Sequence, residues 1–259
     1  MYITRNADCP EFYLPKGYFQ ATLFIKIIPN KPIAVFLFRL IFAFISALRL
    51  KFSFMRNEFI EAIKTHQAAF ELDLADEKIS ALADYYELIQ KNNEFLHLVA
   101  PTSAEEFALR HILESLTLLK FLPNKMRFAD VGTGAGLPSL PCLIVREDLR
   151  GVLIESKIKK VGFLEEAVEK LNLAERVKVV NKQFEESTKA HFFFVTCRAL
   201  DKFTDKLPRL LKWAGKAQLL FFGGNNLREA LIKNKVEFSQ KLMPMSEQRF
   251  LFIARNVQR

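Results

Sequence analysis

The spacing of hydrophobic and polar residues changes twice along the chain. Residues 33–54 are rich in phenylalanine and almost continuously apolar, without the stripe that marks one buried helix face. From Met55 to Leu122 apolar residues recur at helical spacings between charged ones. Beyond Pro123, short apolar runs alternate with amphipathic segments. We therefore expect an atypical segment (1–54), a helical region (55–122) and a core (123–259).

Residues 102–122 show the clearest helical pattern. Thr102 or Ser103 can cap the first turn, and Pro123 follows the last one. The predicted apolar stripe consists of Phe107, Ile112, Leu116 and Leu119. One amphipathic helix is expected here, directly before the first strand of the core.

The core pattern predicts a doubly wound α/β fold. Strands are expected at residues 126–131, 150–156, 176–184, 192–199, 217–224 and 248–256, with helices at 137–147 and 157–172. Alternation of this kind implies parallel strands covered by helices on both faces.

A glycine-rich loop, FADVGTGAGLPSLP (128–141), follows the first strand. Glycine permits the positive φ that a tight turn into a helix needs, and it lets a nucleotide-like ligand approach bare backbone. Leu137 stands where the dinucleotide fingerprint G-x-G-x-x-G has its last glycine. The loop, preceded by Asp130, is instead similar to the first motif of S-adenosylmethionine-dependent methyltransferases. Their second strand ends in an acid that binds the ribose, and Glu155 ends the second strand here.

Charge and cysteine content add modest constraints. The net charge is +9, but residues 1–54 contribute +5 of it, so the rest of the chain is only mildly basic. Such a body is compatible with an RNA partner. The three cysteines are far apart and without metal-ligand spacing, which fits a reducing compartment. We expect a cytoplasmic protein.

Residues 1–54 admit several interpretations. A membrane-spanning helix would have to accommodate Arg39 and Arg49, which interrupt the apolar run. A signal peptide would need basic residues first and a small-residue cleavage site after them, and the segment has neither arrangement. The favoured interpretation is an over-extended reading frame, with translation beginning at Met55. The alternative is a peripheral membrane anchor, which would make residues 33–54 a point of membrane contact.

Four stretches, the glycine loop among them, occur in the order and spacing that one enzyme family shows. They are RHILES (110–115), the loop FADVGTGAGLPSLPCLIVRED, LIESKIKKVGFLEEAVEKLNL, and CRAL (197–200). The chain resembles the bacterial 16S ribosomal RNA guanine-N7 methyltransferases, also called glucose-inhibited division protein B, from about Met55 onward. The resemblance implies a Rossmann-like methyltransferase fold with an N-terminal helical extension. It also implies S-adenosyl-L-methionine as cofactor, 16S rRNA in the small ribosomal subunit as partner, no metal, and a monomer.

The resemblance also implies the site residues. Those expected to bind the cofactor are Gly132, Gly134, Leu137, Glu155, Phe184, Glu185 and Arg198. Those expected at the reaction centre are Arg110, His111 and Arg198. Four of these have plain structural alternatives: His111 as a core histidine, Glu185 in a solvated turn, Arg110 as a surface charge, and Glu155 as a residue that merely ends a strand. The lysines at 157, 159 and 160 could meet RNA phosphates or form a solvated helix start.

The chain also departs from the family pattern. Asn92, His97 and Val99 stand where the family has Trp, Asn and Thr, and Gly223 stands at a lysine position. These departures motivate an alternative function, a non-catalytic RNA- or cofactor-binding relative. A dehydrogenase is a third possibility, against which the missing fingerprint glycine counts.

The expected chemistry needs few groups. Guanine N7 already exposes a lone pair, so methylation requires placement rather than a general base. The sequence accordingly shows no catalytic triad, paired carboxylates or metal-ligand cluster. The target is expected to be an unpaired base, because proteins reach single bases most readily there.

Overall fold

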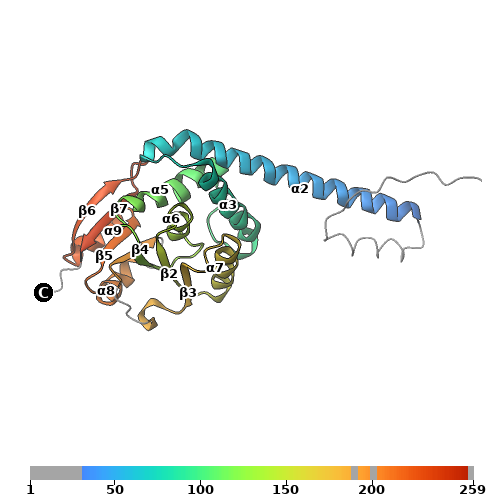
Figure 1. Ribbon diagram of the computed structural model, residues 1–259. Coiled ribbons are helices and arrows are strands. Elements are labelled where there is room, and N and C mark those ends of the chain that lie inside the picture. Colours follow the sequence, from blue (N-terminus) through green and yellow to red (C-terminus); the bar gives the residue numbers. More distant parts are fainter. Residues whose placement is uncertain (1–30, 188–191, 199–202, 256–259) are drawn as a thin grey trace, which may run out of the picture. The chain divides into compact units, whose positions relative to one another are not determined.

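The computed structural model describes residues 31–187, 192–198 and 203–255 (Figure 1). The chain divides into two compact units, Met1–Phe52 and Ser53–Arg259. All described helices and strands lie in the second unit, except for the first part of the long N-terminal helix.

A seven-stranded sheet with the order β3-β2-β1-β4-β5-β7-β6 forms the centre of this unit. Its strands are β1 (Arg127–Val131), β2 (Arg150–Glu155), β3 (Val177–Asn181), β4 (Phe194–Arg198), β5 (Gln218–Gly223), β6 (Glu237–Leu242) and β7 (Phe250–Arg255). The first five pair in parallel. The predicted α/β fold is confirmed.

The far end of the sheet corrects one expectation. Strand β7 runs antiparallel to both β5 and β6, whereas parallel strands were expected throughout. Strand β6 was also missed. Its residues are exposed or only half-buried, because it is an edge strand, so it lacks the apolar run that marks the buried strands.

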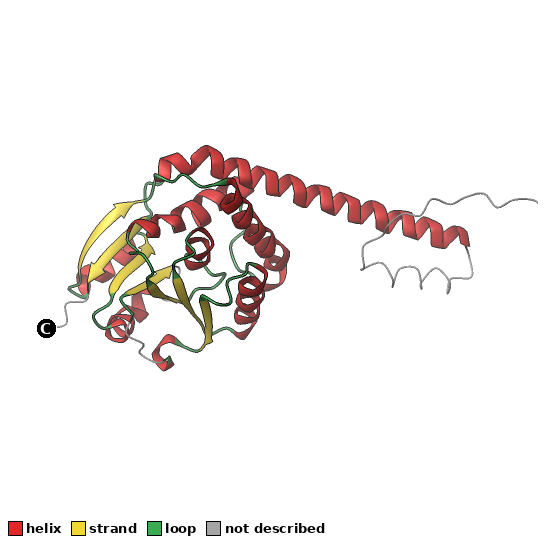
Figure 2. Ribbon diagram, in the orientation of Figure 1, coloured by secondary structure: helices red, strands yellow, loops and turns green. Residues whose placement is uncertain are grey.

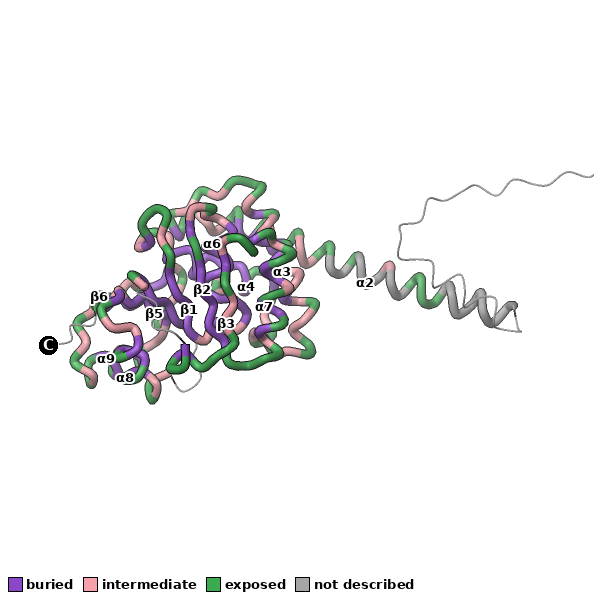
Figure 3. The backbone as a smooth tube through the Cα atoms, turned by 60° about the horizontal axis from the view of Figure 1, so that its bottom comes forward, coloured by how far each residue is buried: buried purple, intermediate pink, exposed green. Residues whose placement is uncertain are grey.

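Helices cover both faces of the sheet (Figure 2). On one face lie α3 (Asp76–Leu96), α6 (Ser139–Val145) and α7 (Ile158–Lys170); on the other lie α8 (Phe203–Ala214) and α9 (Asn225–Lys233). Alternate strand residues enter the two cores: Phe128 packs on the α3 side, Ala129 and Val131 on the α8 side. The tube in Figure 3 shows the central strands as largely buried.

The predicted helix at 102–122 is divided into several short helical turns. They are α4 (Ala104–Phe107), a π-helical turn η2 (Ala108–Leu113), α5 (Glu114–Leu116) and a 3-10 turn η3 (Thr117–Lys120). Ser103 caps the start, since its Oγ accepts a hydrogen bond from Glu106 N at 3.0 Å. Phe107, Ile112 and Leu116 of the predicted stripe are buried. π-turns of this kind often occur at functional sites, and this one carries Arg110 and His111.

Helix α2 (Lys31–His66) runs through Met55 without a break. Two 3-10 turns, η1 (Gln67–Phe70) and η4 (Phe184–Glu186), complete the described elements. Among the described residues, no helix combines the length and apolar character needed to cross a bilayer. The interpretations of residues 1–54, of which 1–30 lie outside the described residues, stay predictions, as does the division at 54 and 122.

Candidate functional site: a cleft at the end of strands β1, β2 and β4

The glycine loop leaves β1 in a conformation that requires glycine. Gly132, Gly134 and Gly136 have φ of 68°, 59° and 93°. At Gly136 space is also lacking, since a Cβ there would lie 2.3 Å from Cδ1 of Leu140. The carbonyl of Ala135 accepts a hydrogen bond from the buried Tyr85 hydroxyl at 2.8 Å. The loop is therefore held in one shape by its own backbone and by α3.

Asp130 holds the loop from beneath. Its Oδ2 accepts hydrogen bonds from Thr133 Oγ1 at 2.6 Å and from Ser139 Oγ at 2.7 Å, joining both ends of the loop to β1. Burial raises the pKa of this carboxyl to about 7, although the two hydroxyl donors act in the opposite direction. Among the described residues, none hydrogen-bonds its Oδ1. The sequence placed Asp130 before the loop but gave no sign of this role.

Glu155 joins the glycine loop to the end of β2. Its Oε2 accepts a hydrogen bond from Gly134 N at 3.0 Å, and its Oε1 accepts one from Lys157 N at 2.9 Å. The residue is 6% exposed, so this carboxylate forms part of the cleft wall rather than a mobile surface group. A ribose against this wall would meet an acceptor that is already oriented.

These residues border a cleft of about 430 Å³. Most of the predicted site residues line it: Gly132, Gly134, Leu137, Glu155, Phe184, His111 and Arg198. A Cβ built on Gly134 would lie 3.9 Å from Lys160 Nζ, an ordinary contact, so glycine is favoured there by its φ of 59° and not by a lack of space. Open backbone, an acidic wall and a buried aromatic ring (Phe184) together suit a nucleoside-bearing cofactor.

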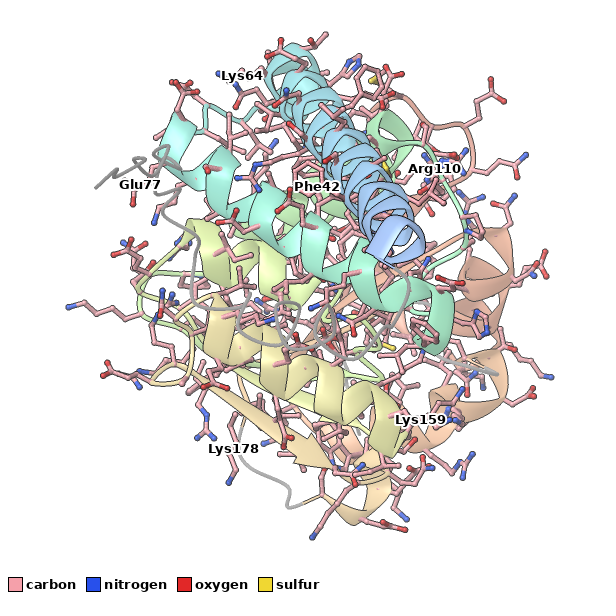
Figure 4. The ribbon with its side chains drawn as sticks, turned by 90° about the vertical axis from the view of Figure 1, so that its right-hand side faces the viewer. Phe42, Lys64, Glu77, Arg110, Lys159 and Lys178 are labelled. Carbon is pink, nitrogen blue, oxygen red and sulfur yellow. The ribbon has the colours of Figure 1, made fainter. Side chains whose placement is uncertain are left out.

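Two predicted residues are not brought to the cleft. Glu185 Oε1 lies 3.1 Å from Arg209 Nη1, and Gln183 lines the cleft in its place. The Arg110 side chain pairs with Glu106 on the surface, where Figure 4 labels it, while its carbonyl accepts a hydrogen bond from Arg198. Their proposed direct roles stay predictions.

His111 is a neutral group at the cleft wall. Burial lowers the pKa of its imidazole to about 3, and the nearby Arg198 acts in the same direction. Its Nδ1 lies 3.4 Å from Arg198 Nη2 and can accept from it. The imidazole therefore adds no positive charge to the cleft at neutral pH.

Arg198 is held by a buried network that sequence reasoning missed. Its Nη2 donates to the Arg110 carbonyl at 2.6 Å and lies 3.6 Å from Glu114 Oε2. Glu114 Oε1 accepts a 2.6 Å hydrogen bond from Arg249 Nε, which comes from the segment before β7. The Glu114 side chain is only 3% exposed, and its charge offsets the two guanidinium groups. The acid stands within the quoted RHILES stretch, so the sequence did contain a signal for it.

The departures from the family pattern lie at two places around the site. Leu98, Val99 and Ala100 line the cleft, and Asn93 holds this segment through a pair of 3.0 Å hydrogen bonds with the Val99 backbone. Gly223 ends β5 and lines a neighbouring pocket. The local backbone at 92–99 is thus ordered despite the substitutions.

Comparison with known proteins decides the family. The model of the family described as rRNA small subunit methyltransferase G matches residues 78–252. The chain belongs to this family. It is therefore an S-adenosylmethionine-dependent enzyme that methylates 16S rRNA.

Individual relatives agree with the family match. Ribosomal RNA small subunit methyltransferase G of Neisseria meningitidis serogroup C is 32% identical over 164 residues, 63% of this chain and 76% of that protein. The protein of the same name from Desulforamulus reducens is 37% identical over 119 residues, 45% of this chain and 50% of its own. Among solved structures, a SAM dependent methyltransferase from Aquifex aeolicus has 18% identity and a TM-score of 0.48, covering 66% of this chain and 98% of that one.

Proposed function

We propose that this chain transfers the methyl group of S-adenosylmethionine to N7 of one guanine in 16S rRNA, with the cleft at the ends of β1, β2 and β4 as its donor site. The observation that carries the proposal is the joining of the glycine loop to Glu155, in a chain that belongs to a 16S rRNA methyltransferase family. The loop offers backbone and the acid offers a ribose acceptor in one rigid wall.

Each residue of the cleft has a distinct part in holding the donor. Glu155 binds the ribose hydroxyls, the loop at Gly132 and Gly134 supports the cofactor with bare backbone, and Phe184 packs beside the adenine. Leu137, buried at the end of the loop, supports the same wall. The support for these roles is that all five residues line one cavity.

The chemistry follows from the charges around the cleft. When bound in this cleft, S-adenosylmethionine would supply a methyl group carried on a positively charged sulfur. The bond between that sulfur and the methyl carbon would break as the bond from N7 to the carbon forms. His111 stays neutral beside it, and Glu114 offsets Arg198, so the wall adds little repulsion toward the cation. Because N7 has a free lone pair, the protein has only to align it with the methyl group.

A rim of lysines suits an RNA substrate. The lysines that line the cleft are Lys157, Lys160, Lys182 and Lys206. Lys159 lies at the start of α7, as Figure 4 shows. Lysine neutralises RNA phosphates regardless of sequence, so these residues would give affinity rather than choice of nucleotide.

The test uses the full chain, methyl-labelled S-adenosylmethionine, and small ribosomal subunits that lack the modification. Label recovered as 7-methylguanosine at one position is the expected result. A label on another atom or on many positions would contradict the proposal.

Gly223 and the altered segment at 92–99 motivate a second outcome, reduced methyl transfer with intact cofactor binding. In that case calorimetry detects S-adenosylmethionine binding while the subunits gain little label. The expected monomeric state is checked by sedimentation of the same protein.

A further inference from the structure

A second pocket of about 420 Å³ lies next to the donor cleft. Arg198 lines both cavities, so its guanidinium stands between them. The pocket lies at the carboxyl ends of β4 and β5, the side of an α/β sheet where ligands bind. A molecule in this pocket is therefore a neighbour of the donor.

Aromatic side chains form the walls of this pocket. Phe203, Phe222 and Phe250 come from α8, β5 and β7, three separate parts of the chain. The Arg198 guanidinium carbon lies 5.7 Å from the centre of the Phe222 ring. The Arg228 guanidinium likewise lies 4.6 Å from the centre of the Phe250 ring, so each of these two rings has one face covered by a cation. The aromatic surface that remains is suited to contact with an unpaired nucleobase.

Three charged side chains form another part of the wall, and of these Glu114 is buried while Arg198 and Arg249 are partly exposed. Glu114 and Arg249 line the pocket together with Arg198. Arg249 Nε donates a hydrogen bond of 2.6 Å to Glu114 Oε1. The other oxygen, Oε2, lies 3.6 Å from Arg198 Nη2, beyond hydrogen-bond distance. The pocket thus presents a carboxylate acceptor between two guanidinium donors.

This set of groups matches one edge of guanine. Guanine carries O6 as an acceptor next to two donors, the N1–H and the 2-amino group, so it can face a guanidinium and a carboxylate at once. Adenine presents one donor, its 6-amino group, and an unprotonated N1 instead. It would therefore offer the Glu114 carboxylate one donor fewer than guanine and set an acceptor against it.

We infer that this pocket receives the target guanine, with the Phe side chains stacking on the base and Glu114 accepting from its N1–H and 2-amino group. The inference rests on the proposed function and adds the site of base recognition to it. Glu114 lines this pocket but not the donor cleft. It would determine the specificity for guanine.

The first test fills the pocket without touching the donor cleft. Asn226 is exposed and lines the pocket from the first turn of α9, so Asn226→Trp should obstruct the base. Ile232→Trp changes an exposed residue of the same helix outside the pocket and is the matched control. We expect Asn226→Trp to lower kcat/KM on small subunits by about tenfold or more, which is the effect of losing one stacked base. Ile232→Trp should keep wild-type kcat/KM, and both variants should keep wild-type affinity for S-adenosylmethionine.

The second test examines recognition of the 2-amino group. Small subunits are reconstituted with guanine or with hypoxanthine, which lacks that amino group, at the target position. The wild type should prefer guanine, and Glu114→Gln should lower kcat/KM for guanine by about 10- to 100-fold. It should also bring the guanine/hypoxanthine ratio toward one. A purely structural role for Glu114 would lower both rates together and leave the ratio unchanged.

The outcomes distinguish a failure of the pocket assignment from a failure of the proposed function. If the wild-type chain and Asn226→Trp methylate equally well, or Glu114→Gln keeps the preference for guanine, the pocket assignment is overturned and the proposed function stands. If the wild-type chain transfers no methyl group to N7, both are overturned.

Discussion

At the scale of single residues, His111 makes stability depend on pH. Its pKa is about 3 in the folded chain and 6.5 as an ordinary histidine. The unfolded state therefore binds more protons between these values, and the free energy of unfolding falls as pH drops below 6.5. This residue alone changes the free energy of unfolding by about 1.4 kcal/mol per pH unit in that range.

His111→Gln isolates that contribution. Urea unfolding of both proteins between pH 4.5 and 7.5 should show the wild type losing stability relative to the variant as pH decreases. Asp130, whose pKa is raised to about 7, acts in the opposite direction in both proteins, because its stabilising effect is lost as pH rises toward 7. A pH-independent difference between the two proteins would contradict the neutral state of His111.

The carboxylate of Glu155 should decide the affinity for the methyl donor. Glu155→Ala removes the ribose acceptor and the hydrogen bonds to Gly134 N and Lys157 N. We expect the Kd for S-adenosylmethionine to rise by about 10- to 100-fold, the effect of about 1.5–3 kcal/mol for a charged hydrogen bond. Calorimetry measures it, with the exposed Glu165→Gln on α7 as control. Equal affinities in the two variants would exclude Glu155 as the ribose ligand.

At the scale of elements, the turn from β1 into α6 requires glycine at position 136 for both its φ and its close contact with Leu140. In Gly136→Ala the new Cβ would lie 2.6 Å from Leu140 Cγ at a φ of 93°. We expect a loss of about 1–3 kcal/mol in unfolding free energy together with weaker cofactor binding.

Gly162→Ala is the matched substitution in α7. Nothing lies within 4 Å of its Cβ position, and the residue is helical, so the variant should gain about 0.5–1 kcal/mol. Denaturation of the two variants side by side tests the loop geometry. Similar stabilities would mean that the loop can relax around an added methyl group.

The junction of β5 and α9 gives a second prediction at this scale. Gly223 stands at a family lysine position, but a Cβ there would lie 2.9 Å from Leu227 Cβ. Leu227 is buried, so Gly223→Lys alone should cost about 1–3 kcal/mol through overpacking. Thermal unfolding measures this cost. Leu227→Ala in the same chain should recover part of it, whereas wild-type stability of the single variant would refute the clash.

At the scale of the whole molecule, the unit Ser53–Arg259 should fold and act without the preceding residues. A protein begun at Met55 keeps Phe59, which stacks on Tyr86 at 4.7 Å, and Arg56, which pairs with Asp84 at 2.7 Å. We expect unchanged methyl transfer and melting temperature relative to the full chain.

A protein begun at Gln67 is the informative control. It lacks Phe59 and Ile63, both completely buried, and should lose more than about 3 kcal/mol. If beginning at Met55 destabilises the protein as much as this, residues 1–54 belong to the folded enzyme.

The resemblance to a methyltransferase family implied the cofactor, whereas the sequence by itself determined the α/β fold and the glycine loop. These depend on local patterns: buried strands read as apolar runs, and a turn with positive φ values requires glycine at fixed spacing. Local patterns did not predict β6, because an edge strand buries too few side chains to show an apolar run. The alternating pattern also predicted the wrong direction for β7, since strand direction is a property of pairing between distant segments.

Only the tertiary structure decided how the site is assembled. Glu114, Arg198 and Arg249 are far apart in the chain, and the folded sheet brings their charges within hydrogen-bond or ion-pair distance. Likewise, burial rather than residue type makes His111 neutral, and neighbours rather than motif place Glu185 against Arg209. Contacts between distant segments and the loss of water around them arise only in the folded chain.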